Sequence, residues 1–301
     1  MTGPDRPASI EPVTDLERPA SRDPAADEAV LAANAAAREA GVRIREITAL
    51  DELDEIVRLY DRIWRRDNNP PLTTELLRAF SKAGNYVAGA YSGRELVGAS
   101  VGFFAAPAHE ALHSHIAGVS PAVRSRRVGF AIKLHQRAWA LLRGTPLIAW
   151  TFDPLVSRNA YFNIVKLAAD PVEYLPNFYG AMNDGINAGD ESDRLLLHWH
   201  LGAPAVAAAC AGQPRPAPPR PTSAALAVSP LGGPQLGRVE GAPVLVAVPR
   251  DIEALRVSDP GLAKEWRVAV RETLSGLLAE GGRITGFIRD GGYVVRGAEA
   301  S

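Results

Sequence analysis

The run from His115 to Arg143 combines a strand pattern, a basic loop with a glycine, and an amphipathic helix pattern. Gly144 ends the helix, whose apolar face carries Phe130, Leu134, Ala138 and Leu141. Backbone N–H groups at a helix start have no intrahelical acceptor, and the helix dipole adds partial positive charge there. Gly129 would let an anion approach where a Cβ would obstruct it. The run therefore requires a strand that leads into a helix, and it predicts an anion-binding loop between them.

The periodicity of the surrounding sequence predicts alternating strands and helices. A strand is expected over residues 42–47, and a helix with an apolar stripe from Leu53 to Trp64 follows it. The further expected elements are a short helix over 74–83, a hairpin of 86–91 and 95–104, strands over 115–119 and 147–152, a short helix over 159–166, and strands over 172–178 and 194–201.

The loop sequence resembles the acyl-CoA signature of the GNAT acetyltransferase superfamily. The matching residues are Val119-x-Pro121, followed by Arg126-x-x-Gly129-x-Ala131. The resemblance implies an α/β (α+β) fold with a GNAT-type mixed, mostly antiparallel central sheet flanked by helices. The chain as a whole is similar to a predicted-acetyltransferase branch of that superfamily that carries a C-terminal extension.

The same resemblance implies acetyl-CoA or another acyl-CoA as co-substrate, and it assigns binding residues. In the family, the strand before the loop pairs with the pantetheine arm, and the loop holds the pyrophosphate. The residues implied are Ala117, Gly118 and Val119 for the arm, Arg126, Arg127, Val128, Gly129, Phe130 and Ala131 for the pyrophosphate, and Asn159 in the helix that approaches the thioester.

The family's usual general acid is a tyrosine in that last helix, and this sequence has Lys166 at the corresponding position. Lys166 could donate the proton if burial lowered its pKa. The sequence is equally compatible with a lysine on the surface. Tyr161 is a substitute candidate if the helix is rotated. The general acid is therefore open between these two residues.

Three residues are candidates for the general base. Asp153 follows the strand over 147–152, where the GNAT sheet splays open, although it could equally cap a turn before Pro154. His113 and His115 alternate on a strand, so both face one side of the sheet. Either histidine could be the base, or both could be structural.

Two further regions carry polar or aromatic side chains. Residues 171–187 could line an acceptor pocket or form an edge strand and a loop. Arg267 and Arg271 lie one helical turn apart and could grip a carboxylate, although solvated arginines are the more common case. His198 and His200 supply too few ligands for zinc, so no metal is expected.

Composition excludes several classes. The chain has 33 Lys and Arg against 34 Asp and Glu, so no global field favours nucleic acid or an anionic membrane. Cys210 is the one cysteine and cannot form an internal disulfide. No apolar N-terminal segment or membrane-length run is present, which predicts a cytoplasmic protein that binds neither nucleic acid nor membrane.

The expected organisation has four parts. Residues 1–40 are a disordered tail with a weakly packed, Ala-rich helix, and 41–202 are the GNAT-like domain. Five prolines in the ten residues 213–222 make 203–242 a linker or surface excursion. Residues 243–295 form a β-α-β unit packed on the first domain, with a possible role in homodimerisation.

These observations predict an acyl-CoA-dependent N-acyltransferase that moves an acetyl or other acyl group to a small-molecule amine by direct transfer in a ternary complex. Without the usual tyrosine, the alternative is a non-catalytic acyl-CoA-binding or regulatory module with the same fold.

Overall fold

The computed structural model describes residues 14–16, 23–64, 71–180, 190–239, 241 and 243–297, and it contains two β-sheets. The first sheet has seven strands in the order β1-β2-β3-β4-β5-β7-β6. All neighbours are antiparallel except β4 and β5, which confirms the mixed, mostly antiparallel sheet. Its strands are β1 (Arg43–Glu46), β2 (Tyr86–Ser92), β3 (Glu95–Phe104), β4 (Ala111–Val119), β5 (Leu147–Phe152), β6 (Asp170–Leu175) and β7 (Arg194–His200).

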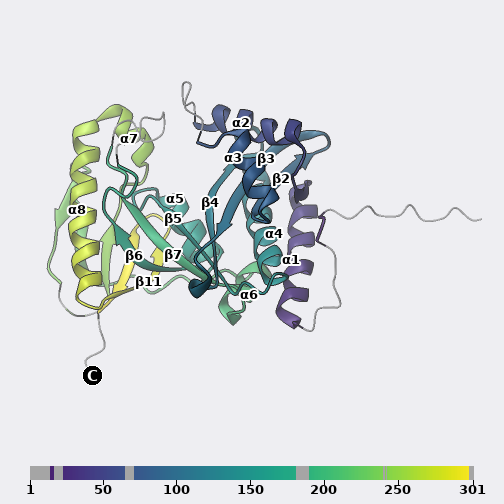
Figure 1. Cartoon of the computed structure of the whole chain (residues 1–301). Helices are drawn as coiled ribbons and strands as arrows, with labels where there is room; N and C mark the ends of the chain where they lie inside the picture. Colours follow the sequence, from purple (N-terminus) through teal and green to yellow (C-terminus); the bar gives the residue numbers. More distant parts are fainter. Residues whose placement is uncertain are drawn as a thin grey trace, which may run out of the picture.

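Helices cover both faces of this sheet (Figure 1). One face packs on α1 (Pro24–Ala40), α4 (Val128–Leu141), α5 (Ser157–Ala160) and the π-helix η3 (Tyr161–Lys166). The other face packs on α2 (Leu50–Trp64) and α3 (Thr74–Lys82). Short 3-10 turns, η1 (Pro107–His109) and η2 (Pro121–Arg126), precede and follow β4. The sheet thus separates an α4 face from an α2–α3 face.

The Ala-rich helix α1 packs firmly, so the expectation of weak docking is wrong. Its buried stripe consists mainly of alanines, and these small side chains allow close contact with α4. Asp23 caps its start and Gly41, in the left-handed region at φ 61°, ends it. The buried residues are Ala26, Ala29, Val30, Ala33, Ala36, Ala37 and Ala40.

A short piece of the expected disordered tail is also bound to the fold. Thr14 forms a parallel β-bridge with Ile44 of β1. Asp15 accepts a hydrogen bond from the backbone of Glu46, and its other oxygen lies 3.0 Å from Nε2 of the fully buried His135. These contacts are specific enough to order residues 14–16.

The second sheet lies in the C-terminal part and has five strands in the order β11-β12-β10-β8-β9. Two of its strands and α6 (Pro204–Cys210) fall within 203–242, which was expected to be a linker or excursion. The unit is therefore larger than the expected β-α-β. Its elements are β8 (Ser223–Val228), β9 (Pro234–Leu236), β10 (Val244–Ala247), α7 (Ile252–Ser258), α8 (Pro260–Ala279), β11 (Arg283–Ile288) and β12 (Gly292–Arg296).

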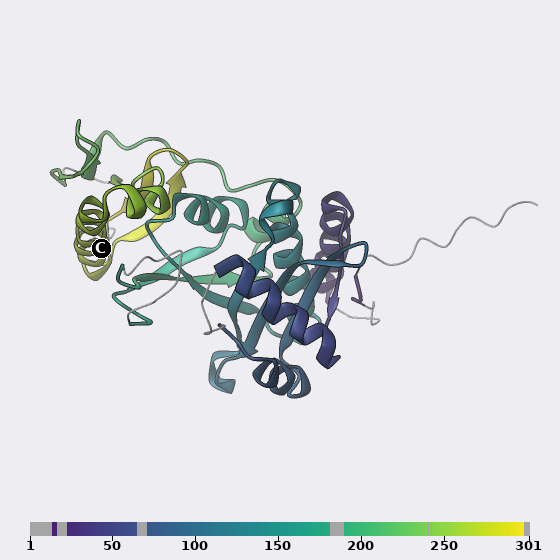
Figure 2. The ribbon, with the colours of Figure 1, turned by 90° about the horizontal axis from the view of Figure 1, so that it is seen from above.

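The C-terminal unit shares one hydrophobic core with the α4 face of the first sheet. Trp266 of α8 and Phe287 of β11 are fully buried in the same cluster as Trp199 of β7. Figure 2 shows α1 near one end of the molecule and the C-terminal helices at the other, with the first sheet between them. No helix in the described part of the chain has the length and apolar character that a membrane crossing requires.

Candidate functional site

The first sheet opens between β4 and β5. These strands pair from Ala111 to His113 and from Leu147 to Ala149, whereas β4 continues to Val119 and β5 to Phe152. Past the last pair, β4 stays bonded to β3 and β5 to β7. Ala117 is exposed although it lies in an interior strand. We call this divergence, between residues 114–119 and 150–152, the opening; there β4 presents backbone groups that β5 does not pair.

His115 is the extra residue of a β-bulge in β4. Ile116 pairs with Val101 and Ser114 pairs with Gly102, so His115 stands between two ladder pairs. The bulge places His115 and Ile116 on the same side, the α2–α3 face. Ser114 faces α4. The opening therefore has a histidine on one face and a serine on the other.

The start of α4 lies beside the far end of β4. Arg127 has a left-handed backbone at φ 60°, and its carbonyl accepts from the amides of Phe130 and Ala131. Within the described residues, no acceptor is found for the amides of Arg127, Val128 and Gly129. A Cβ on Gly129 would lie 3.7 Å from Val119 of β4. Three successive amide donors at a helix start, next to a glycine and the opening, form an anion-binding geometry.

The side chains of this loop make contacts within the protein. The guanidinium of Arg126 donates to the carbonyls of Ala40 and Gly41 at the end of α1. That of Arg127 pairs with Glu39 and lies over the ring of Phe130. The side chains of Val128, Phe130 and Ala131 are buried. The anion-binding role expected of residues 126–131 therefore stays with the loop backbone, because these side chains make contacts within the protein.

The three strand residues implied for the pantetheine arm divide between the two faces. Val119 lies near Gly129 on the α4 face, whereas Gly118 faces α2. A Cβ on Gly118 would come within 2.8 Å of Trp64, so this glycine is required for α2 to pack on β4. Ala117 is exposed at the opening. Only the backbone of Gly118 is available to a ligand there.

Asp153 is not positioned as a general base. Its carboxylate accepts two hydrogen bonds of 2.9 Å from Arg267 and one of 2.6 Å from Arg256. Burial alone would raise the pKa of this carboxyl, but the charges of the two guanidiniums outweigh it and hold the pKa well below its usual range. The same arginines bind Asp190. We call Asp153, Asp190, Arg256 and Arg267 the junction cluster, because it joins the end of β5 to α7 and α8.

The junction cluster also overturns the interpretation of Arg267 as a solvated residue, since it is 1% exposed. Arg271, one turn on, binds both oxygens of Asp193 and also Glu191. Two sequence candidates, Asp153 and Arg267, thus satisfy each other. Arg267 and Arg271 do bind carboxylates, as expected, but these carboxylates are side chains of the protein itself.

His113 and His115 remain available for proton transfer. Their rings are 6.1 Å apart and both contact Phe103, on the α2–α3 face. Burial, together with the charges of His115 and Lys133, lowers the pKa of His113 to about 4. Burial also lowers the pKa of His115. Both imidazoles are therefore neutral at pH 7 and can accept a proton, and His115 is the one at the opening.

The two candidates for the general acid, Lys166 and Tyr161, lie away from the opening. Lys166 is exposed, and its Nζ lies 6.0 Å from the ring centre of Tyr161. The guanidinium carbon of Arg289, in the β11–β12 turn, lies 5.3 Å from the same ring centre. Asn159 is exposed as well. In the described residues, no hydrogen bond or ring contact joins Lys166 or Tyr161 to β4, β5 or α4.

A residue that the sequence analysis missed, Lys133 of α4, is buried at the opening with 6% exposure. Its Nζ donates to Oγ of Ser114 at 2.9 Å and lies 3.8 Å from the ring centre of Trp150 of β5. Burial lowers the pKa of Lys133 to about 7. Lys133 precedes Leu134 of the expected apolar face, but its burial depends on how the sheet packs on α4, which the sequence pattern does not show.

The segment expected to line an acceptor pocket is partly described. Tyr174 is buried and donates to Asp193, which is a structural contact. Phe178 and Tyr179 are exposed, and the hydroxyl of Tyr179 lies 3.2 Å from Oγ1 of Thr151 on β5. Residues 181–187 of the expected pocket lie outside the described residues. Tyr179 therefore remains a candidate for acceptor contact beside the opening.

Two other sequence features have no catalytic geometry. His198 and His200 lie 6.1 Å apart on β7, and the described residues contain no group of three or more His, Cys, Asp or Glu that could hold a metal ion. Cys210 is buried, and burial raises the pKa of its thiol to about 11. Its thiolate is therefore not available as a nucleophile at neutral pH.

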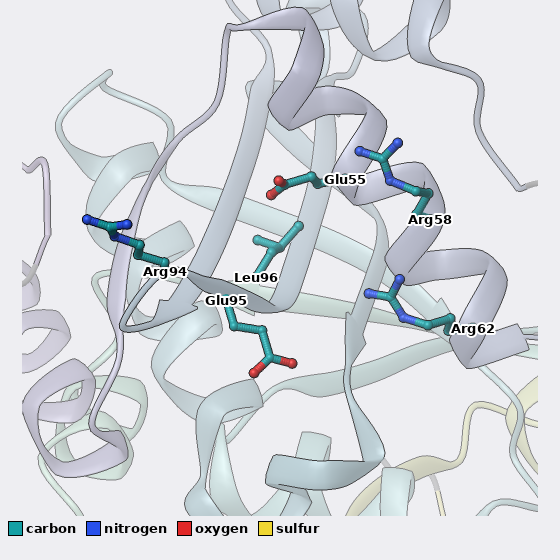
Figure 3. Close-up of a pocket in the computed structure, with 6 residues that line it drawn as sticks. All are labelled: Glu55, Arg58, Arg62, Arg94, Glu95 and Leu96. Carbon is teal, nitrogen blue, oxygen red and sulfur yellow. The ribbon is translucent and has the colours of Figure 1, made fainter.

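A pocket of about 260 Å³ lies elsewhere, between α2 and the β2–β3 turn. Figure 3 shows residues of α2 on one side and residues of the hairpin on the other. It contains neither the loop amides nor a residue of β4 or β5. Its lining residues are Glu55, Arg58, Arg62, Arg94, Glu95 and Leu96.

No protein-family model and no curated protein matches this sequence. Solved structures do match. The Escherichia coli ribosomal-protein-S18-alanine N-acetyltransferase is 10% identical with a TM-score of 0.43, over 53% of this chain and 94% of that one. A GNAT-family acetyltransferase from Streptococcus pneumoniae is 14% identical with a TM-score of 0.43, over 52% and 97%.

The Salmonella typhimurium acetyltransferase yncA, solved with acetyl-CoA, is also similar. It is 14% identical with a TM-score of 0.44, over 54% of this chain and 94% of its own. The likeness concerns the arrangement of elements in about half of this chain. What the opening can bind and do follows from its own residues.

Proposed function

We propose that this protein binds an acyl-CoA at the opening and transfers the acyl group to an amine. The observation that carries the proposal is the parting of β4 from β5 next to three amides at the start of α4, for which the described part of the chain offers no acceptor. A diphosphate suits those amides, because they are fixed donors at the positive end of a helix. An extended arm that contains amide groups suits the unpaired backbone of β4.

The two ends of this site fit one ligand. From Val119, beside the loop, to Ser114, β4 runs five residues, or roughly 17 Å at the usual rise of a strand. A ligand anchored by its diphosphate at the loop would follow β4 along this length. Its reactive end would lie where β4 and β5 meet, next to the bulge. The arrangement therefore favours a carrier with an anion at one end and its acyl group at the other.

In this proposal, His115 is the general base. Its neutral imidazole lies at the bulge on the α2–α3 face, so an amine approaching from that face would meet a proton acceptor beside the acyl carbon. A fixed base and a fixed thioester convert a bimolecular attack into a reaction of bound partners. The acceptor is a small-molecule amine that reaches the opening from the side of Tyr179 and Thr151.

The binding step is tested with Gly129→Glu. A carboxylate at this position would repel a diphosphate and occupy its space, so the affinity for CoA is expected to fall at least ~100-fold in titration calorimetry. Gly276→Glu is the matched control, because Gly276 lies on an exposed part of α8 with nothing within 4 Å of an added Cβ. Equal CoA affinity in both variants would refute the loop as the anion site.

The transfer step is tested by release of free thiol from acetyl-CoA in the presence of a panel of primary amines. Turnover that depends on both an amine and His115 is expected. CoA binding without thiol release from any amine or from water would contradict an enzyme and support a binding module.

A further inference from the structure

Lys133 occupies a position that the proposed acyl transfer has not yet used. It lies on α4 four residues after Gly129, so the two residues share one face of the helix, one turn apart. Gly129 stands beside Val119 at the far end of the opening, and Lys133 stands beside Ser114 at the closed end. The α4 face of the opening therefore runs from the amide donors to the ammonium of Lys133.

The environment of this ammonium is unusual for a buried charge. Its contacts are the hydroxyl of Ser114, the side-chain oxygen of Gln136 at 3.3 Å, and the face of Trp150. No carboxylate in the described part of the chain forms an ion pair with it. The titratable group of β4 that interacts with it is His113. A lysine buried without a counter-ion costs stability, and such a residue is a candidate for function.

Lys133 and His115 stand on opposite faces of the opening. His115 contacts Phe103 on the α2–α3 face, whereas Lys133 contacts Ser114 and Trp150 on the α4 face. A group held between β4 and β5 would thus have a proton acceptor on one side and a proton donor on the other. This is the arrangement that acyl transfer requires, since the amine loses a proton and the departing sulfur gains one.

We propose that Lys133 is the catalytic proton donor to the thiolate that leaves the acyl group, an inference that rests on the proposed acyl-CoA function. The amine nitrogen forms a bond with the carbonyl carbon and gives one proton to His115. The carbon–sulfur bond breaks, its electron pair stays on sulfur, and sulfur takes a proton from Nζ of Lys133. Amide and thiol are the products; His115 gives its proton to water, and Lys133 regains one from water.

The proton affinity of Lys133 agrees with this role. A pKa of about 7 leaves a substantial fraction of the side chain as ammonium at neutral pH. A thiol ordinarily has a pKa of about 8.5, so transfer from this ammonium to a thiolate is downhill. Lys166, at the position of the family's usual acid, is exposed and has no contact with the strands of the opening in the described residues.

The test compares the same substitution at two lysines, Lys133→Met and Lys166→Met, in the full chain. Methionine matches the length of lysine and suits a buried site beside Trp150. Free CoA is the probe, and the titration of its bound thiol is followed by thiolate absorbance. Lys133 carries its ammonium mainly below pH 7, and there it stabilises a neighbouring thiolate, so a larger fraction of the bound thiol is expected to be ionised at pH 7 in the wild type and in Lys166→Met than in Lys133→Met.

Activity gives the second measurement. Lys133→Met is expected to lower kcat for thiol release about 100-fold while the affinity for CoA changes less than about threefold. Lys166→Met is expected to keep the wild-type kcat. A wild type that does not bind CoA would refute the proposed function itself. CoA binding with the same thiol titration and kcat in wild type and Lys133→Met would overturn the role of Lys133 alone, as would a loss of both confined to Lys166→Met.

Discussion

Two buried groups of charge in this molecule differ in how completely they are paired. In the junction cluster, the carboxylate of Asp153 receives hydrogen bonds from two arginines, and Arg267 also reaches Asp190. At the opening, Lys133 has a hydroxyl, an amide oxygen and an aromatic ring, and the loop amides of α4 lack acceptors within the described residues. The charges of the junction cluster are thus paired by protein groups, whereas the donors at the opening are not fully paired within the described residues.

The contrast separates structure from function. A buried charge whose hydrogen bonds are all made within the protein cannot bind a ligand as well. Removing it leaves its partners buried with an unpaired charge. Donors without acceptors gain their bonds only when something binds. The position of Asp153 after β5 suggested a catalytic residue, but its hydrogen bonds to two arginines give it a structural role. The following predictions set the two regions against each other.

The largest expected effect is at the junction cluster. Arg267→Met leaves the buried Asp153 with one of its two arginines, and the free energy of unfolding is expected to fall by about 3–5 kcal/mol in urea denaturation. Arg158→Met is the control, since Arg158 also pairs with the C-terminal unit, through Glu253, but is 63% exposed. Its loss should cost at most about 1 kcal/mol. Equal losses of unfolding free energy in the two variants would show that the buried junction cluster stabilises the fold no more than an exposed ion pair does.

The next effect is on chemistry rather than stability. His115→Gln is expected to lower kcat about 100-fold, equivalent to about 2.7 kcal/mol, without changing CoA affinity. In the wild type, the rate should rise as pH increases through the lowered pKa of His115, below 6.5, and fall as pH increases past about 7, where Lys133 loses its proton. The variant should lack the rise. His200→Gln, on the exposed part of β7, is the control; a similar loss there would count against His115.

A third prediction concerns stability at the opening, and it has the opposite sign to the first. The pKa of Lys133 is about 7 in the folded protein against 10.5 as a model value, so the unfolded chain binds more protons between these pH values. Wild-type stability therefore rises with pH through this window. Lys133→Met should therefore gain stability relative to the wild type as the pH falls from 10.5 to about 7, and the difference should vanish toward pH 10.5. A difference independent of pH would show that Lys133 is not desolvated.

The smallest effects are expected at the pocket between α2 and the β2–β3 turn. Arg58→Ala and Arg62→Ala remove exposed charges that lie away from both buried groups. Each should change the free energy of unfolding by less than about 0.5 kcal/mol and CoA affinity by less than about twofold. A large loss of CoA affinity in either variant would move the anion site from the α4 loop to this pocket.

The sequence was most informative where the relevant physics is local. A strand, a basic loop and a glycine at a helix start lie within 15 or so residues, and the amide donors follow from the helix itself. Asp153 and Arg267 are 114 residues apart, so their pairing depends on how the C-terminal unit packs. Likewise, the burial of Lys133 against Trp150 comes from the sheet and not from the periodicity of α4.

Small residues and register were the other sources of error. The stripe of alanines in α1 carries little apolar area per residue, and its value lies in the close approach that it allows to α4. The side-chain contacts of Arg126 with Ala40 and Gly41 likewise become visible only when α1 is in place. The bulge at His115 depends on how β4 aligns with β3, which no pattern within β4 reveals.

That single added residue interrupts the regular ladder between β4 and β3. Deleting His115 would restore regular pairing without reversing any side chain, because Ser114 already faces α4 and Ile116 already faces the α2–α3 side. Gly118 would therefore stay beneath Trp64, and the packing of α2 on β4 would be kept. A chain one residue shorter at this position can therefore keep both faces of β4, although it lacks the imidazole.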